Sequence, residues 1–424
     1  MPFLQALLSP ETPARTITLY FDHEDFRRKW TTRLLTETLE EEGFTVAAVH
    51  RHEVTLDRAF LDKTDQVWFF LKSTDERDKL TEEEVSALRT WMDGGGGVLI
   101  TGDHGDGVSR SMIKPLGAPI GRQIPRAGHL RVWDADKIPG PTLELGSTNS
   151  TWNASTDQTA EEDASAQRLL VASPRHPIFS GGLDLFPDHR HEGLVVEPCV
   201  RPGEDGRYPE EWFREGELPR TEPPPRARII ARGIDWERGV TFPLMAAWED
   251  RSGLGRILAD ASWHHYVDQN LVGFAGETLV KIRRLYRNIA NHLMPARARE
   301  RLIAQALRAA IPADLDLVDN RVLGEWVGKV LQEELSPTLA AEARAWLSDD
   351  LAADPKLELE HLPVHLAGER ARRIKAALDQ GDDDAVADAW NHEDALRSAI
   401  HSASKGRLPI DEVDTILTRL RARE

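Results

Sequence analysis

Short apolar runs alternate with amphipathic stretches along the first 295 residues of the chain. Runs rich in β-branched, aromatic and aliphatic side chains predict strands at 16–21, 44–49, 67–71, 98–101, 228–231, 244–248 and 256–260. Apolar residues at helical spacing predict helices at 26–42, 81–92 and 279–293. Strands and helices that alternate over short connections are typical of a doubly wound sheet. We therefore expect an α/β fold with a mostly parallel, flavodoxin-like sheet.

The helix predicted at 81–92 carries the clearest local signal. Thr81 and Glu84 have the spacing of a capping box, and Leu80 and Val85 can close a hydrophobic staple over it. Four glycines then lead into the apolar run 98–101. Because glycine allows a sharp turn, we expect the chain to bend on both sides of this strand.

Two long polar segments, 107–175 and 201–226, interrupt the pattern, and connections of that length are usually functional or mobile loops. The strands at 244–248 and 256–260 flank a plausible hairpin turn. From residue 296 onward, alanine, leucine and arginine dominate at helical spacing. We therefore expect an α/β domain over 1–295 and a smaller all-helical domain over 296–424.

Composition narrows the classes of partner. The chain has 53 Lys and Arg residues against 71 Asp and Glu residues, a net charge of −18. Such an acidic chain repels nucleic-acid phosphates and anionic lipid, so we expect neither as a partner. Cys199 is the only cysteine, which excludes an internal disulfide or a cysteine-based zinc site. No signal-peptide pattern and no apolar run of about 20 residues occurs, so we expect a cytoplasmic protein.

Three predicted strands end in segments that carry acids or histidines. The polar and aromatic side chains of these segments are Asp22, His23, Asp103, His104, Asp106, Trp263, His264 and His265. The carboxyl ends of parallel strands share one edge of a sheet, and open α/β sheets bind their ligands there. We therefore expect these side chains to form one site. Acids and amides after a strand also serve as turn formers and helix caps, which is the alternative for any one of them.

The chemistry of the site stays open at this level. The residues expected to carry catalysis are Asp103, His104 and His264, and the expected ligand contacts are Asp22, His23, Asp106, Arg126, Trp263 and His265. A divalent metal is a candidate cofactor, with Asp103, His104, Asp106 and His264 as candidate ligands, but these residues do not fall in an HExxH motif. Ser262 lies outside any GxSxG elbow, which argues against a serine hydrolase.

Three segments resemble the class I glutamine-amidotransferase-like superfamily, and within it the ThuA-like (trehalose-utilisation-type) branch. They are 80–104, which includes the glycine run and Asp103-His104; 176–193, which begins His176-Pro177-Ile178-Phe179; and 255–264, which ends Ser262-Trp263-His264. The resemblance covers roughly 15–295 and implies the sheet and the location of the site. Amidotransferases of this superfamily have a cysteine at the strand exit occupied here by Asp103-His104, so it also implies that glutaminase chemistry is absent. His264 matches the histidine that follows a late strand in those enzymes.

Three functions fit these observations. The first is an amidotransferase-like protein without glutaminase activity that binds a small polar ligand, sugar-like or nucleotide-like, and is coupled to a partner through 296–424. The second is a metal-assisted hydrolase that uses the Asp and His cluster. The third is a non-catalytic scaffold for other proteins. We also expect 107–175 to fold as a lid over the carboxyl edge, with four basic side chains facing inward: Arg122, Arg126, His129 and Arg131.

Overall fold

The structure is a computed structural model. It describes residues 15–73, 75–101, 120–126, 166–173, 175–180, 182–187, 205–207, 227–235, 240–248, 254–260, 262–272, 274–296, 298–299, 302, 329, 338–340 and 373. The chain divides into two compact units, Ala14–Ala296 and a second made of Met1–Pro13 with Arg297–Glu424. The first unit is described below. The all-helical character predicted for 296–424 and most of the two polar segments lie outside the described residues.

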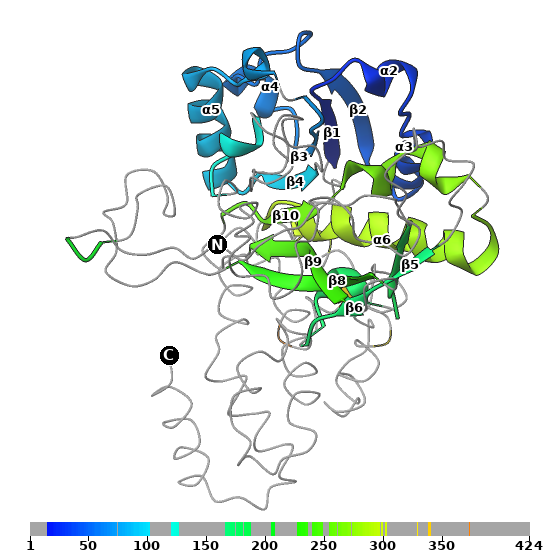
Figure 1. Ribbon diagram of the computed structural model, residues 1–424. Helices are drawn as coiled ribbons and strands as arrows, with labels where there is room; N and C mark the ends of the chain where they lie inside the picture. The colour runs from blue at the N-terminus through cyan, green and yellow to red at the C-terminus, as the bar shows by residue number, and fades with distance from the viewer. Residues whose placement is uncertain are drawn as a thin grey trace, which may run out of the picture. The chain divides into compact units, whose positions relative to one another are not determined.

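An eight-stranded sheet forms the centre of this unit, in the order β2-β1-β3-β4-β10-β9-β8-β6 (Figure 1). Its strands are β1 (Thr16–Phe21), β2 (Thr45–His50), β3 (Gln66–Phe70), β4 (Gly97–Thr101), β6 (Leu170–Val171), β8 (Arg228–Asp235), β9 (Val240–Trp248) and β10 (Ile257–Asp260). The strands from β2 to β10 are parallel, and β9, β8 and β6 extend the sheet antiparallel. A separate antiparallel pair joins β5 (Ala166–Arg168) to β7 (Leu185–Pro187).

Helices cover both faces of the parallel part. The α-helices are α2 (Asp25–Arg28), α3 (Arg33–Glu41), α4 (Arg58–Leu61), α5 (Glu82–Asp93) and α6 (Gly276–Leu293). The 3-10 turns are η1 (Glu76–Asp78), η2 (Ile120–Arg122), η6 (Pro177–Phe179), η8 (Trp263–Tyr266) and η9 (Asp268–Leu271). Figure 1 shows α4 beside α5, and α3 beside α6.

Strand β3 is buried on both faces, as its continuous apolar sequence predicts. Val67 and Phe69 belong to the core cluster that includes Leu88 and Met92 of α5. The alternate residues point to the other face, because successive side chains of a strand alternate. Trp68 packs its ring 6.2 Å from that of Tyr266, and Gln66 donates a hydrogen bond to the Ala290 carbonyl of α6.

The glycine run before β4 allows close packing as well as a turn. A Cβ at Gly97 would collide with the backbone carbonyl of Leu293 at the end of α6. A Cβ at Gly255, just before β10, would collide with the carbonyl of Gly96. A side chain at Gly97 would therefore push α6 away from the sheet, and a side chain at Gly255 would push the start of β10 away from β4.

The strands predicted from the apolar runs are confirmed, with ends that shift by a few residues. The antiparallel pairing of 244–248 with 256–260 and the capping box of Thr81 and Glu84 are also confirmed. The prediction of a single helix at 26–42 is wrong, because the helical conformation is interrupted at Lys29–Thr32, between α2 and α3. Among the described helices, none is long and apolar enough to cross a membrane.

Candidate functional site

The strand order reverses direction at β1. The chain goes from β1 outward to β2 and then returns to β3 on the other side of β1. At such a switch point, the connections that leave the two central strands run to opposite faces and leave a crevice at their carboxyl ends, which is where open α/β sheets bind ligands. The sheet topology therefore places the candidate site at the ends of β1 and β3.

Asp22 occupies this position, directly after β1. Its side chain is buried, and its two carboxylate oxygens accept hydrogen bonds from the backbone N–H groups of Lys72 (2.8 Å) and Ser73 (3.0 Å), which follow β3. Burial raises the pKa of Asp22 to about 7, and the nearby Asp78 adds to this effect, although the two hydrogen bonds oppose it. Asp22 therefore exchanges a proton near neutral pH.

A cavity of about 130 Å³ opens beside Asp22. It is lined by Phe21, Asp22, His23, Glu24, His50, Arg51, His52 and Asp78. The side chains of His23 and His52 are 38% and 68% exposed, so the cavity opens to solvent on their side. Burial, together with the charge of Arg27, lowers the pKa of His50, which is therefore neutral at pH 7. We call this feature the β1 cavity.

Hydrogen bonds and ion pairs fix one wall of the β1 cavity. Asp78 accepts a hydrogen bond from the Ser73 hydroxyl, and its other carboxylate oxygen lies 3.3 Å from Nε2 of His52. Arg51 binds both carboxylate oxygens of Glu84, at 2.8 and 2.9 Å. It also donates to the backbone carbonyls of Asp78 and Lys79. The guanidinium group of Arg51 is thus occupied by protein acceptors, and the lining as a whole is acidic.

The second strand exit, at β10, holds a buried polar network. The Asp260 carboxylate lies 2.8 Å from Nδ1 of His265 and accepts a 2.7 Å hydrogen bond from the Tyr266 hydroxyl. All three side chains are buried, and burial raises the pKa of Tyr266 well above its usual value. Tyr286 of α6 donates a hydrogen bond to the backbone carbonyl of His265. This network fixes η8 between the sheet and α6.

Trp263 and His264 belong to an aromatic cluster. The His264 ring stacks on that of Trp263 at 3.5 Å, and both side chains are buried. Phe26 and Trp30 pack edge-on against Trp263, at 5.1 and 5.2 Å between ring centroids. The segments that follow β1 and β10 therefore contact each other through aromatic packing. Trp263, His264 and His265 do not line the β1 cavity.

The outcome for the other predicted residues is mixed. Asp22 and His23 line the β1 cavity together. Asp103, His104 and Asp106 lie outside the described residues. Thr101, the last described residue of β4, pairs in register with Phe70 and Asp260 at the carboxyl edge. Within the described parts of the chain, no three His, Cys, Asp or Glu side chains are arranged to hold a metal ion.

Arg126 is placed differently from its prediction. Its buried guanidinium pairs with Asp93, the last residue of α5, and lies 5.6 Å from the ring centroid of Trp248. Trp248 is paired with Ile257, the first residue of β10, which puts Arg126 at the amino edge of the parallel strands. Gln123, in the same segment, exchanges two hydrogen bonds with Leu80. The segment 120–126 thus packs along α5, with contacts at both ends of the helix. Arg126 stabilises the fold at the edge of the sheet opposite the β1 cavity. Arg122, His129 and Arg131 have no described side chains.

The sequence analysis missed His50, Arg51, His52 and Asp78. His50 is the last residue of β2, Arg51 and His52 follow it, and Asp78 comes after β3. These are the two strands that flank β1. In a doubly wound sheet, the strands on either side of β1 end next to Asp22. The predicted fold could therefore have identified these four residues as neighbours of Asp22.

Comparisons with known proteins give few matches. No family model matches the chain, and no curated protein does. Among solved structures, a ThuA-like protein from Parabacteroides merdae is similar at 14% sequence identity and a TM-score of 0.34. That similarity covers 66% of this chain and 92% of the other.

Proposed function

We propose that the α/β unit binds a small, uncharged, polyhydroxylated molecule in the β1 cavity. The observation that carries this proposal is the buried carboxyl of Asp22, which lines a cavity at the switch point of the sheet. A carboxyl group that exchanges its proton near neutral pH can accept or donate a hydrogen bond to a hydroxyl group. His52 and Asp78 add further hydrogen-bonding groups on the same cavity wall.

The charge of the lining favours a sugar-like ligand over a nucleotide. Glu24 and Asp78 are acidic, Asp22 adds a negative charge when it loses its proton, and Arg51 is held by Glu84 and two backbone carbonyls. A phosphate group would meet these acids without a guanidinium available to it. The cavity volume is that of about four water molecules, so it fits one edge of a sugar ring.

The experiment is a thermal-shift titration of the full chain with glucose and with myo-inositol, and with AMP as the anionic probe. We expect at least one of the two polyols to raise the melting temperature, because a ligand that binds only the folded state stabilises it. His52→Ala should abolish the shift, since His52 lines the cavity and is largely exposed. Arg33→Ala is the control, because Arg33 is 82% exposed on α3 and does not line the cavity.

Two results would contradict the proposal. One is the absence of a shift with either polyol, and the other is a shift that His52→Ala leaves unchanged. A shift with AMP alone would reject the uncharged class of ligand.

The remaining predictions stay proposals. The absence of glutaminase activity rests on Asp103 and His104 at a strand exit where amidotransferases have cysteine. A metal-assisted hydrolase would draw its ligands from Asp103, His104, Asp106 and His264, and metal analysis of the purified chain tests it. Coupling to a partner through 296–424 rests on the sequence alone.

A further inference from the structure

A shallow groove lies on the outer surface between α4 and α5. It is lined by Arg58, Glu82, Glu83, Ser86, Ala87 and Thr90, and we call it the α4–α5 groove. Its volume is about 490 Å³. The buried residues of α5 include Glu84, Leu88, Trp91 and Met92, so the groove lies on the opposite face of the helix.

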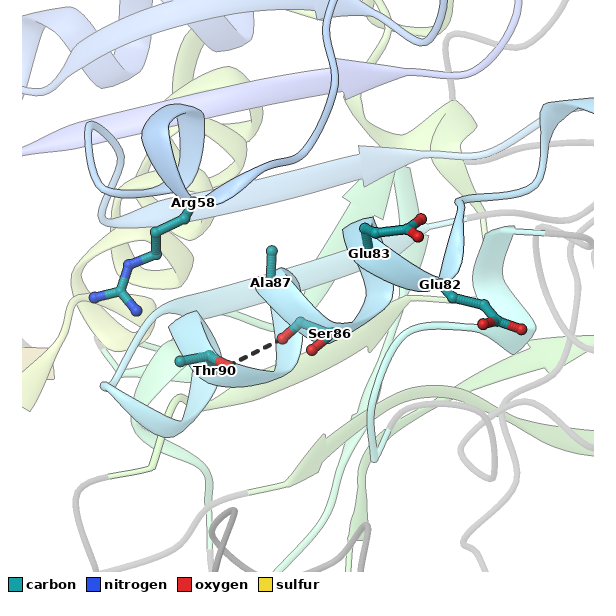
Figure 2. Close-up of a pocket in the computed structure, with 6 residues that line it drawn as sticks. All are labelled: Arg58, Glu82, Glu83, Ser86, Ala87 and Thr90. Carbon is teal, nitrogen blue, oxygen red and sulfur yellow. Dashed lines mark hydrogen bonds between the residues drawn. The ribbon is translucent and has the colours of Figure 1, made fainter.

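Charge is distributed unevenly along this groove. Figure 2 shows Arg58 at one end and Glu82 and Glu83 at the other. Arg58 is 64% exposed, and its Nε donates to Asp62, a bond that does not use its two terminal nitrogens. Glu82 and Glu83 are exposed in the first turn of α5.

Small side chains lie between the charged ends. Ser86, Ala87 and Thr90 form the middle of the groove. The Thr90 hydroxyl donates to the Ser86 carbonyl of its own helix at 3.1 Å, which satisfies its hydrogen bond and leaves its methyl group for contact. A second helix can therefore approach α5 closely at this point.

The pattern is complementary to itself. A helix rises about 1.5 Å per residue, so Glu82 and Glu83 lie about 6 Å from the midpoint between Ser86 and Ala87, and Thr90 lies about 5 Å away on the other side. A two-fold axis at that midpoint places the two acids of one copy opposite Thr90 and Arg58 of the other. The same operation brings two α5 helices together antiparallel, which also aligns their dipoles favourably.

We propose that two copies of this chain pair through the α4–α5 groove about a two-fold axis. Such an interface is isologous, since Arg58 of each copy meets Glu82 and Glu83 of the other. The groove is shallow and its charges are at the rim, so the dimer forms reversibly, with a Kd on the order of 10 µM.

The test uses the full chain in sedimentation equilibrium at up to about 100 µM, where a Kd of that size gives mostly dimer. Arg58→Glu and the double substitution Glu82→Arg, Glu83→Arg should each weaken dimerisation at least about tenfold, because each places like charges face to face. When the two variants are mixed, they should form a heterodimer, since both contact regions then pair opposite charges. Arg77→Glu is the control, because Arg77 is 90% exposed and lies outside the groove.

Recovery on mixing shows that both variants are folded, and it separates loss of pairing from loss of structure. The proposal is overturned if the unmodified chain remains monomeric at about 100 µM, or if either variant dimerises as the unmodified chain does. It is also overturned if the mixture stays monomeric. None of these outcomes depends on the ligand proposed for the β1 cavity.

Discussion

At the scale of single residues, Asp22 combines two roles. Its carboxylate holds the backbone at Lys72 and Ser73, and the same group lines the β1 cavity. A carboxyl buried at such a position stabilises the fold most when it is protonated, because the pKa is about 7 in the folded chain and near 4 in the unfolded chain.

The first prediction concerns pH. Between about pH 4 and pH 7 the folded chain keeps a proton on Asp22 that the unfolded chain has lost, so stability falls as pH rises through this window. Asp22→Asn removes this titration. The free energy of unfolding of the unmodified chain should therefore fall relative to that of the variant by about 1.4 kcal/mol per pH unit.

Urea unfolding of both proteins at pH 5 and pH 7 measures this difference, and titrations common to both proteins cancel. A difference that is the same at the two pH values would mean that Asp22 titrates in its ordinary range.

The sequence predicts the role of a residue when the partners of that residue are its neighbours along the chain. The capping box at Thr81 and Glu84 and the position of Asp22 after a strand both depend on neighbouring residues, and the structure has both. Trp263, His264 and Arg126 depend on distant partners. Phe26 and Trp30 cover Trp263 from more than 230 positions away, and Asp93 pairs with Arg126. Nothing near these residues in the sequence indicates that they are buried.

At the scale of elements, the N-terminus of α3 is capped by a residue from a distant part of the chain. Its N-cap residue, Thr32, makes no side-chain cap bond. Asp268 of η9 instead accepts hydrogen bonds from the backbone N–H groups of Arg33 and Leu34, both at 2.8 Å, and from the Thr31 hydroxyl. The break between α2 and α3, which the apolar spacing did not predict, lies next to this contact.

The second prediction follows from that cap. Asp268→Ala leaves the first N–H groups of α3 without their acceptor and should lower the free energy of unfolding by about 1–2 kcal/mol. Asp268→Asn keeps one acceptor oxygen and should cost less. Urea unfolding of the two variants and of the unmodified chain measures the order of their free energies of unfolding. Equal stability of Asp268→Ala and the unmodified chain would show that Asp268 does not stabilise α3.

At the scale of the whole α/β unit, α6 holds the sheet from one face although it comes last in the sequence of this unit. Its buried residues include Ile282, Leu285, Ile289 and Leu293. Arg283 and Arg287 both pair with Glu41 of α3, and the Ala290 carbonyl accepts a hydrogen bond from Gln66 of β3. The first half of the unit therefore depends on residues about 220 positions further along the chain.

The third prediction tests the contact between α6 and β4. Gly97→Ala would place a methyl group against the Leu293 carbonyl, and backbone atoms on both sides leave little room for adjustment. We expect a loss of more than about 3 kcal/mol in the free energy of unfolding, comparable to severe overpacking of a core. Gly94→Ala is the matched control, since the nearest atom to its Cβ is the Trp91 carbonyl oxygen at 3.3 Å. A similar, small loss in both variants would show that α6 does not pack tightly on β4.

The last prediction concerns the boundary of the unit. A fragment of residues 14–296 keeps every contact of α6 named above and ends where the compact unit ends. We expect it to unfold cooperatively and to show the same dependence on Asp22 between pH 5 and pH 7 as the full chain. A fragment that stops at residue 275 lacks α6, so the Trp68 and Tyr266 face of the sheet loses its cover. It should bind hydrophobic dyes and lack a cooperative transition. Cooperative unfolding of the shorter fragment would mean that the sheet is stable without the helix. Failure of the longer one would mean that the unit needs residues of Met1–Pro13 or Arg297–Glu424.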